Sequence, residues 1–202
     1  MEVSDDFLIG GDELFHEPRF VNHYTFMIND YIPNIEKPIA FFLSCSKHKP
    51  YNKSPYRRVF HAMLNKKLAL RDLSQIYTVS EPAIIVPEEL DDTNITKYEF
   101  PPNKLKEKGR IIFIERLSIL LPKLIHAHKY SFYILPKHHR EIFEKALKII
   151  VENENKSKLT EKLLSSKVKY APPLTYNLPK VREIVEITLK KNKLVGYLTS
   201  EE

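Results

Sequence analysis

The amino-acid sequence predicts an α/β protein: a three-layer sandwich with helices on both faces of a mostly parallel central sheet. Short apolar runs of strand length alternate along the chain with longer segments whose apolar residues recur at helical spacing. The apolar runs are continuous rather than alternating, which is typical of strands buried on both faces. With 43% of its 202 residues hydrophobic, the chain can fill such a core.

The first elements follow an irregular lead-in, residues 1–16. Apolar side chains recur at helical spacing over residues 18–32 and predict an amphipathic helix. The continuous apolar run 39–43 predicts the first buried strand. Ser54 and Pro55 then mark the start of a second helix, because a hydroxyl caps free N–H groups and proline is tolerated in the first turn.

The middle of the chain continues the alternation. Residues 75–80 predict a second strand, residues 81–92 a proline-bracketed loop around a short apolar run, and residues 95–100 a third extended segment. A long apolar pattern over residues 103–130 predicts a helix. Pro122 predicts a kink or a break in it, since proline removes a helical hydrogen bond.

The last third of the chain begins with another buried strand, residues 131–136, and an amphipathic helix, residues 138–154. After these we expect a short helix over 159–164, a proline-rich linker over 171–179 and a closing helix over 180–191.

Two segments of different composition are therefore predicted: an α/β core domain over residues 1–150 and a basic helical C-terminal extension over residues 151–202. No apolar run approaches the roughly 20 residues that a membrane helix needs. The acidic N-terminus lacks the basic start and apolar stretch of a signal peptide, and one cysteine cannot form an internal disulfide. We expect a cytoplasmic protein without membrane contact.

The net charge of +6 favours contact with a polyanion, because basic side chains that neutralise phosphates release counterions. The alternative is a lysine-rich surface that is only solvated.

The most informative stretch follows the first strand. Cys45 stands at the carboxyl end of that strand, the edge at which α/β sheets bind ligands. Lys47, His48 and Lys49 surround it, and a helix begins soon after. A thiol in a basic setting can act as a nucleophile, and the loop can bind an anion. A small buried side chain and a solvated turn are the alternatives.

Other chemical motifs are weak. The pattern GxxxxGK[ST] does not occur, which argues against a P-loop nucleotide hydrolase. Two histidine pairs raise the question of a metal, but no HExxH pattern accompanies them. We interpret all four as surface residues and expect no metal and no cofactor; they are His126, His128, His138 and His139.

The stretch "LSCSKHKPYNKSPYRR", residues 43–58, resembles a motif of the archaeal archaeosine synthase family, which are paralogues of tRNA-guanine transglycosylase. The matching residues are Cys45, Lys49, Pro50, Tyr51 and Ser54. Ser44 stands where the family has a proline, and Arg57 stands near the position of a histidine.

Two further segments support the resemblance, which covers roughly residues 20–150. "SEPAIIVPEEL" is similar to a Ser-Pro, Val-Pro, Glu-Leu stretch of the family, and "YEFP" to its Tyr-x-x-Pro. The matching residues are Ser80, Pro82, Val86, Pro87, Glu89, Leu90, Tyr98 and Pro101.

The resemblance implies a uracil-DNA glycosylase-like version of the three-layer fold and a role in tRNA modification. The family acts on tRNA that carries preQ0, a deazaguanine with a nitrile, and adds an amine donor to the nitrile carbon. It implies a catalytic role for Cys45 as nucleophile, for Lys49 in stabilising anionic charge and for Glu89 as a proton carrier. The substrate-binding residues that it implies are Tyr51, Ser54, Arg57 and Ser80.

Full-length members of that family carry a transglycosylase-like domain before this region and an RNA-binding PUA domain after it. We therefore expect tRNA and a separate transglycosylase-like or PUA-containing subunit as partners. Two alternatives stay open: a non-catalytic nucleic-acid-binding or assembly subunit on the same fold, and an unrelated hydrolase that acts on nucleic acid.

Overall fold

A five-stranded sheet forms the middle layer of the computed structural model, which describes residues 6–65, 70–153, 164–172 and 174–191. The strand order is β4-β3-β2-β6-β7. The strands are β2 (Ile39–Ser44), β3 (Ser74–Ser80), β4 (Ile84–Pro87), β6 (Tyr130–Ile134) and β7 (Val168–Tyr170). All neighbouring strands are parallel except β3 and β4. The predicted α/β class is confirmed, with one antiparallel pair in the sheet.

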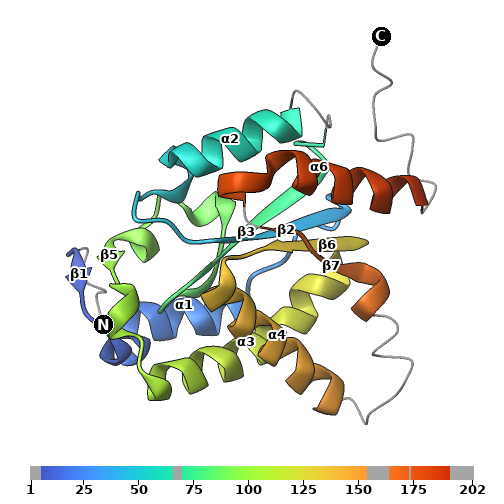
Figure 1. Ribbon diagram of the computed structural model, residues 1–202. Coiled ribbons are helices and arrows are strands. Elements are labelled where there is room, and N and C mark those ends of the chain that lie inside the picture. Colours follow the sequence, from blue (N-terminus) through green and yellow to red (C-terminus); the bar gives the residue numbers. More distant parts are fainter. Residues whose placement is uncertain (1–5, 66–69, 154–163, 173, 192–202) are drawn as a thin grey trace.

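Helices cover both faces of this sheet (Figure 1). The helices α1 (Pro18–Asn29), α3 (Glu107–Ala127) and α4 (Lys137–Asn153) cover one face, and α2 (Pro55–Met63) and α6 (Leu174–Lys191) cover the other. None of the helices within the described ranges is both long and apolar enough to cross a membrane.

The sequence of the central strand β2 is apolar from Ile39 to Leu43 because both of its faces are covered. Phe41 packs on Phe60 of α2, with ring centroids 5.1 Å apart, so it faces the layer of α2 and α6. The next residue, Phe42, packs on Phe143 of α4 at 5.2 Å on the opposite face. Both are fully buried, because alternate side chains of a strand point to opposite faces.

Short strands escape the sequence pattern. The apolar run inside the predicted loop 81–92 is β4, which pairs with β3. The predicted extended segment 95–100 contributes only β5 (Tyr98–Glu99), which pairs with β1 (Leu8–Ile9) in a separate two-stranded sheet. The lead-in that we expected to be irregular therefore contains a strand, held by a ladder too short to leave a periodic signal.

The C-terminal segment also differs from the expectation of a helical extension. β7 lengthens the main sheet, and α6 begins at Leu174 and runs through the predicted linker. Val181, Val185 and Leu189 of α6 are buried in the cluster under α2. The described part of this segment thus completes the three layers. The helix predicted over 159–164 lies outside the described residues, apart from Leu164.

The N-terminus of α3 is capped by a residue distant in sequence. Asp12 accepts hydrogen bonds from the backbone N–H groups of Lys106, at 3.0 Å, and Gly109, at 2.8 Å. These satisfy two of the donors that a helix start leaves free. A Cβ added at Gly109 would lie 2.2 Å from Oδ1 of Asp12, so this contact requires glycine. Beyond it, α3 is one uninterrupted helix despite Pro122.

The Asp12 cap predicts that the effect of Gly109→Ala on stability changes sign when Asp12 is replaced by alanine. Asp12→Ala should lower the free energy of unfolding by about 1 kcal/mol, because it removes the cap. Gly109→Ala should also destabilise the protein, because its methyl group displaces the Asp12 carboxylate. In the Asp12→Ala background the nearest remaining neighbour of the added Cβ is Cδ1 of Leu105, at 2.9 Å, which is the end of a flexible side chain and can move. There Gly109→Ala should stabilise by up to about 0.5–1 kcal/mol through helix propensity. Urea denaturation of the four proteins measures this, and the same sign in both backgrounds would contradict it.

A second prediction concerns His23 of α1, whose Nε2 contacts the carbonyl oxygen of Ile85 at 2.8 Å. Burial lowers the pKa of His23 to about 4, although the Ile85 carbonyl favours the charged form. The unfolded chain protonates near the usual pKa of 6.5, so this contribution to stability is complete above pH 6.5 and is lost as the pH falls towards 4. Between pH 6.5 and pH 4 the free energy of unfolding of the wild type should therefore fall by about 3 kcal/mol more than that of the His23→Gln variant. Denaturant titrations at several pH values test this; parallel curves would refute it.

A candidate active site at the carboxyl edge of the sheet

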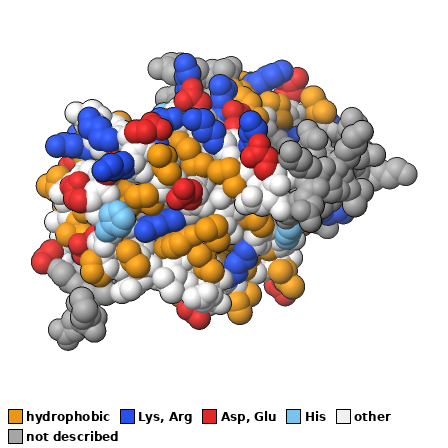
Figure 2. Space-filling view, turned by 90° about the horizontal axis from the view of Figure 1, so that it is seen from below, with side chains coloured by type: hydrophobic (Ala, Val, Ile, Leu, Met, Phe, Trp, Pro, Cys, Tyr) orange, Lys and Arg blue, Asp and Glu red, His pale blue; other side chains and the backbone are white. Residues whose placement is uncertain are grey.

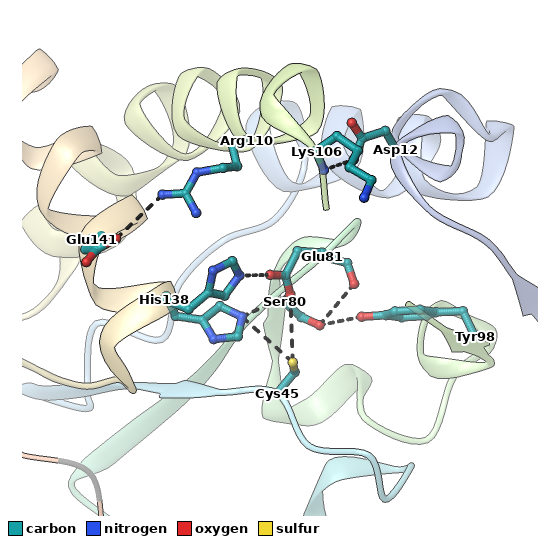
Figure 3. A network of polar contacts seen from close by, with 10 residues as sticks. Asp12, Cys45, Ser80, Glu81, Tyr98, Lys106, Arg110, His138 and Glu141 are labelled. Carbon is teal, nitrogen blue, oxygen red and sulfur yellow. Dashed lines mark hydrogen bonds and ion pairs between the residues drawn. The ribbon is translucent and has the colours of Figure 1, made fainter. Parts of the chain in front are cut away.

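Three chain segments bring polar side chains to one edge of the sheet (Figure 3). Cys45 directly follows β2, Glu81 directly follows β3, and His138 and His139 lie in the first turn of α4, just after β6. Because β2, β3 and β6 are parallel, their carboxyl ends meet at this edge. The backbone N–H of Cys45 donates to the Val79 carbonyl at 3.0 Å, which fixes the cysteine to the end of the ladder.

The four side chains form a connected group. Nε2 of His139 lies 3.0 Å from Oε2 of Glu81 and 3.9 Å from Sγ of Cys45. Sγ lies 4.0 Å from the same carboxylate oxygen. His138 contacts the other oxygen, Oε1, through its Nε2 at 2.8 Å. Glu81 and His139 are each only 7% exposed, whereas Cys45 is half-buried. A reachable thiol therefore borders a buried carboxylate–imidazole pair.

Burial and charge act against each other in this pair. Burial alone would disfavour the Glu81 carboxylate, but the positive charge of His139 and hydrogen bonds from both histidines hold the pKa of Glu81 well below its usual value. Burial likewise disfavours charge on His139, but the Glu81 carboxylate outweighs it and raises the pKa of His139 to about 10. The pair is therefore a carboxylate and an imidazolium at neutral pH.

Three hydroxyl groups lie beside this group. The Tyr51 hydroxyl is 3.0 Å from Oγ of Ser80 and 2.8 Å from the hydroxyl of Tyr98. Ser80 and Tyr98 also hydrogen-bond to each other, so the three close a ring. Burial raises the pKa of both tyrosines above the usual value. Both tyrosines therefore stay neutral. They and Ser80 are each only 1% exposed, so the ring lies beneath the edge, where its O–H groups bond to one another.

Lys49 completes the neighbourhood. Its Nζ donates to the Tyr98 carbonyl and lies 3.1 Å from the centroid of the Tyr98 ring. Burial lowers the pKa of Lys49 to about 8, while the negative charges of Cys45, Glu99 and Glu81 oppose that shift. The ammonium is thus close to the thiol and to Glu81, where it can stabilise an anion.

Of the residues predicted from the sequence, Cys45, Lys49, Tyr51 and Ser80 come together at this edge, and the other three do not. Ser54 is the N-cap of α2 and accepts from the backbone N–H of Arg57 at 3.1 Å. Ser54 therefore has a structural role. Arg57 has one as well, because its side chain is buried between α2 and the sheet, where Nη2 donates to Oγ1 of Thr78 at 2.7 Å.

Glu89 lies at the opposite end of the sheet. It accepts hydrogen bonds from Tyr31 and from Gln75, each at 2.8 Å. Gln75 is at the start of β3 and Ser80 is at its end, a separation of roughly 16 Å at the usual rise of a strand. The antiparallel strand β4 carries the chain back along β3, and this reversal removes Glu89 from the site.

The sequence interpretation missed Glu81, His138 and His139. The interpretation of the two histidines as surface residues is wrong for His139, which is buried, and both histidines contact Glu81. Their position gave a usable signal, since each residue follows a predicted buried strand. His128 is also buried, held by the Tyr77 hydroxyl and the Lys37 carbonyl.

The arrangement can support two kinds of chemistry. A thiol beside an imidazolium is the pairing found in cysteine nucleophiles. The sulfur, the carboxylate oxygen and the imidazole nitrogen also lie close enough together to hold one metal ion, and among the described residues Cys45, Glu81 and His139 form such a ligand group.

Comparison with known proteins identifies a family without an assigned function. A family described as "Domain of unknown function (DUF5591)" matches residues 20–168, which include every residue of the site. No curated protein matches the chain. The chain is also similar to a solved structure described as "Crystal structure of AF0587, a protein of unknown function", with 15% sequence identity and a TM-score of 0.48. The match covers 91% of this chain and 51% of AF0587, so this chain spans about half the length of AF0587.

The reactivity of Cys45 should depend on Glu81. Alkylation by iodoacetamide proceeds through the thiolate, and Glu81 keeps its imidazolium partner His139 charged. Glu81→Gln should therefore slow alkylation at neutral pH about tenfold, measured by mass spectrometry on the chain's single cysteine. The matched control is Glu89→Gln, which removes a carboxylate at the other end of the sheet. In this variant Cys45 should be alkylated at the wild-type rate. Equal effects of the two substitutions would contradict the prediction.

Proposed function

This chain belongs to the DUF5591 family, and we propose that it is an enzyme in which Cys45 attacks an electrophilic carbon while His139 and Glu81 handle the proton. One observation carries the proposal: Sγ of Cys45 lies 3.9 Å from an imidazole nitrogen that is paired with a buried carboxylate. A surface thiol needs no such pair, and a buried carboxylate is costly unless it is compensated.

The substrate class that we propose is the nitrile of preQ0 carried by tRNA, with an amine as the second substrate. The support is the resemblance of residues 43–58 to the archaeosine synthase motif and the suitability of a nitrile for thiol addition. Of the matching residues, Cys45, Lys49 and Tyr51 lie at the candidate site. The same resemblance is the basis for proposing the uracil-DNA glycosylase-like variant of this α/β fold.

The proposed reaction needs no redox chemistry, and the only group that leaves is the thiolate of Cys45 itself. The thiolate of Cys45 bonds to the nitrile carbon as one carbon–nitrogen π bond breaks, and His139 gives its Nε2 proton to the nitrogen, which yields a thioimidate. The amine then adds to the same carbon and returns a proton to His139. The carbon–sulfur bond breaks, releasing an amidine and restoring the thiolate–imidazolium pair. The net change is addition of an amine N–H across the nitrile.

The remaining groups bind and orient. Lys49 can stabilise negative charge that develops on the nitrile nitrogen. The hydroxyls of Tyr51, Ser80 and Tyr98 form a buried, mutually hydrogen-bonded set beneath the edge that holds the surrounding segments in place. Departures from the family motif, Ser44 and Arg57, do not interrupt this set, since Arg57 is directed to Thr78.

We also propose that another subunit, transglycosylase-like or PUA-containing, supplies much of the tRNA contact, and that the reaction is cytoplasmic. On the face covered by α1, α3 and α4, acidic and basic side chains are interspersed with hydrophobic ones (Figure 2). On this face the positive charge is not gathered into one basic surface of the kind that binds nucleic acid; the other support is the resemblance, since full-length members of that family carry such domains.

The test is nucleoside mass spectrometry of preQ0-containing tRNA after incubation with the protein and free lysine or glutamine. The wild type should form the amidine adduct, and Cys45→Ala should form none. Glu89→Gln should retain activity, because it lies away from the site. Free preQ0 without an amine should add its mass to Cys45 as a thioimidate. Salt-sensitive tRNA binding without product or thioimidate would overturn the proposal in favour of a non-catalytic subunit.

A further inference from the structure

Three ligand-type atoms converge at the end of the sheet from three different segments (Figure 3). Sγ of Cys45, Nε2 of His139 and Oε2 of Glu81 lie 3.9, 4.0 and 3.0 Å apart, taking sulfur–nitrogen, sulfur–oxygen and nitrogen–oxygen in turn. The group does not depend on a mobile surface loop, since Glu81 and His139 are buried and Cys45 is tied to β3 through its backbone.

These separations are close to those of a tetrahedral zinc site. Zinc bonds to sulfur, nitrogen and oxygen at their usual lengths place sulfur about 3.6 Å from either lighter ligand and nitrogen about 3.4 Å from oxygen. The distances at this edge therefore differ by roughly 0.3–0.4 Å from the tetrahedral values, a change that small side-chain rotations can make.

The groups around these three atoms also suit a bound metal ion. His138 contacts Oε1 of Glu81 and leaves Oε2 directed at the other two atoms, the outer contact that a metal-binding carboxylate usually has. The thiolate and the carboxylate together supply two negative charges to balance a divalent cation. The ammonium of Lys49, which donates to the Tyr98 carbonyl, is one positive charge against these two negative charges.

We propose that Cys45, His139 and Glu81 form a binding site for a zinc-like divalent cation, with a fourth position open to solvent or a ligand. The donor set of sulfur, nitrogen and one oxygen selects Zn²⁺ or Co²⁺ over Mg²⁺ and Ca²⁺, which prefer oxygen ligands alone. Because the cation withdraws electron density from the sulfur and occupies Nε2 of His139, metal binding lowers the reactivity of the thiol and removes the proton donor of the proposed reaction. The consequence for catalysis, reversible inhibition by zinc, rests on the proposed function; the binding does not.

The binding test uses Co²⁺ added to the reduced protein without oxygen. A thiolate-to-cobalt charge-transfer band in the near ultraviolet should rise and saturate at one ion per chain. The band reports this site alone, because Cys45 is the only cysteine in the sequence. His139→Gln and Glu81→Gln should weaken binding at least tenfold, and His138→Gln, which removes the outer contact, about tenfold. Glu89→Gln should bind like the wild type.

A second readout needs no variant and so does not depend on how the variants fold. Zn²⁺ should slow alkylation of Cys45 in the wild type at least tenfold, Mg²⁺ should not, and a chelator should restore the rate. No charge-transfer band, no protection by Zn²⁺, or a band unchanged by His139→Gln would overturn the metal site. If the charge-transfer band appears and no amidine forms, the metal site is supported and the proposed function is overturned. If amidine forms and the band is absent, the proposed function is supported and the metal site is overturned.

Discussion

The buried carboxylate of Glu81 is the constraint on which the rest of the site depends. A carboxylate removed from water is strongly unfavourable unless charges and hydrogen bonds compensate it. Here the compensation comes from His138 and His139, 57 and 58 residues further along the chain. The pair therefore ties the end of β3 to the first turn of α4, and it does so next to Cys45 at the end of β2.

The layers of the fold hold this edge in place. β2 is buried on both faces, and its aromatic residues pack on α2 on one side and on α4 on the other. Because α4 is packed through Phe143, its first turn has little freedom to move away from the sheet. On the neighbouring side, Arg19 donates to the carbonyls of Asn94 and Lys97 and so holds the loop that carries Tyr98. The thiol, the imidazole and the hydroxyl ring are thus positioned by different elements of one rigid core.

Much of this architecture is predictable from local sequence, and the remainder has identifiable physical reasons for escaping prediction. The buried strands and long helices leave continuous or periodic apolar patterns, so β2, β3, β6 and α4 were found. β4 and β7 are short: β4 follows β3 after a tight turn that holds only residues 81–83, and β7 pairs with β6, which lies more distant in the sequence. Cys45 was found because it follows a strong strand. His139 was misjudged because its burial depends on a carboxylate 58 residues away, and Glu89 because the reversal at β4 is invisible to a local pattern.

The same atoms can support covalent catalysis or metal binding, and the two uses compete for one position, the hydrogen on Nε2 of His139. The proposed reaction uses the hydrogen on Nε2 of His139, which Glu81 holds in place at 3.0 Å. A metal ion replaces that hydrogen, because imidazole binds metals through an unprotonated nitrogen. A site that places a positive charge beside a sulfur atom and a carboxylate can hold either a proton or a zinc-like cation there. In the proposed reaction the sulfur attacks while the proton is in place, and in the proposed metal site the sulfur is a ligand instead. The buried pair that makes Cys45 a plausible nucleophile is therefore also what makes it a plausible ligand.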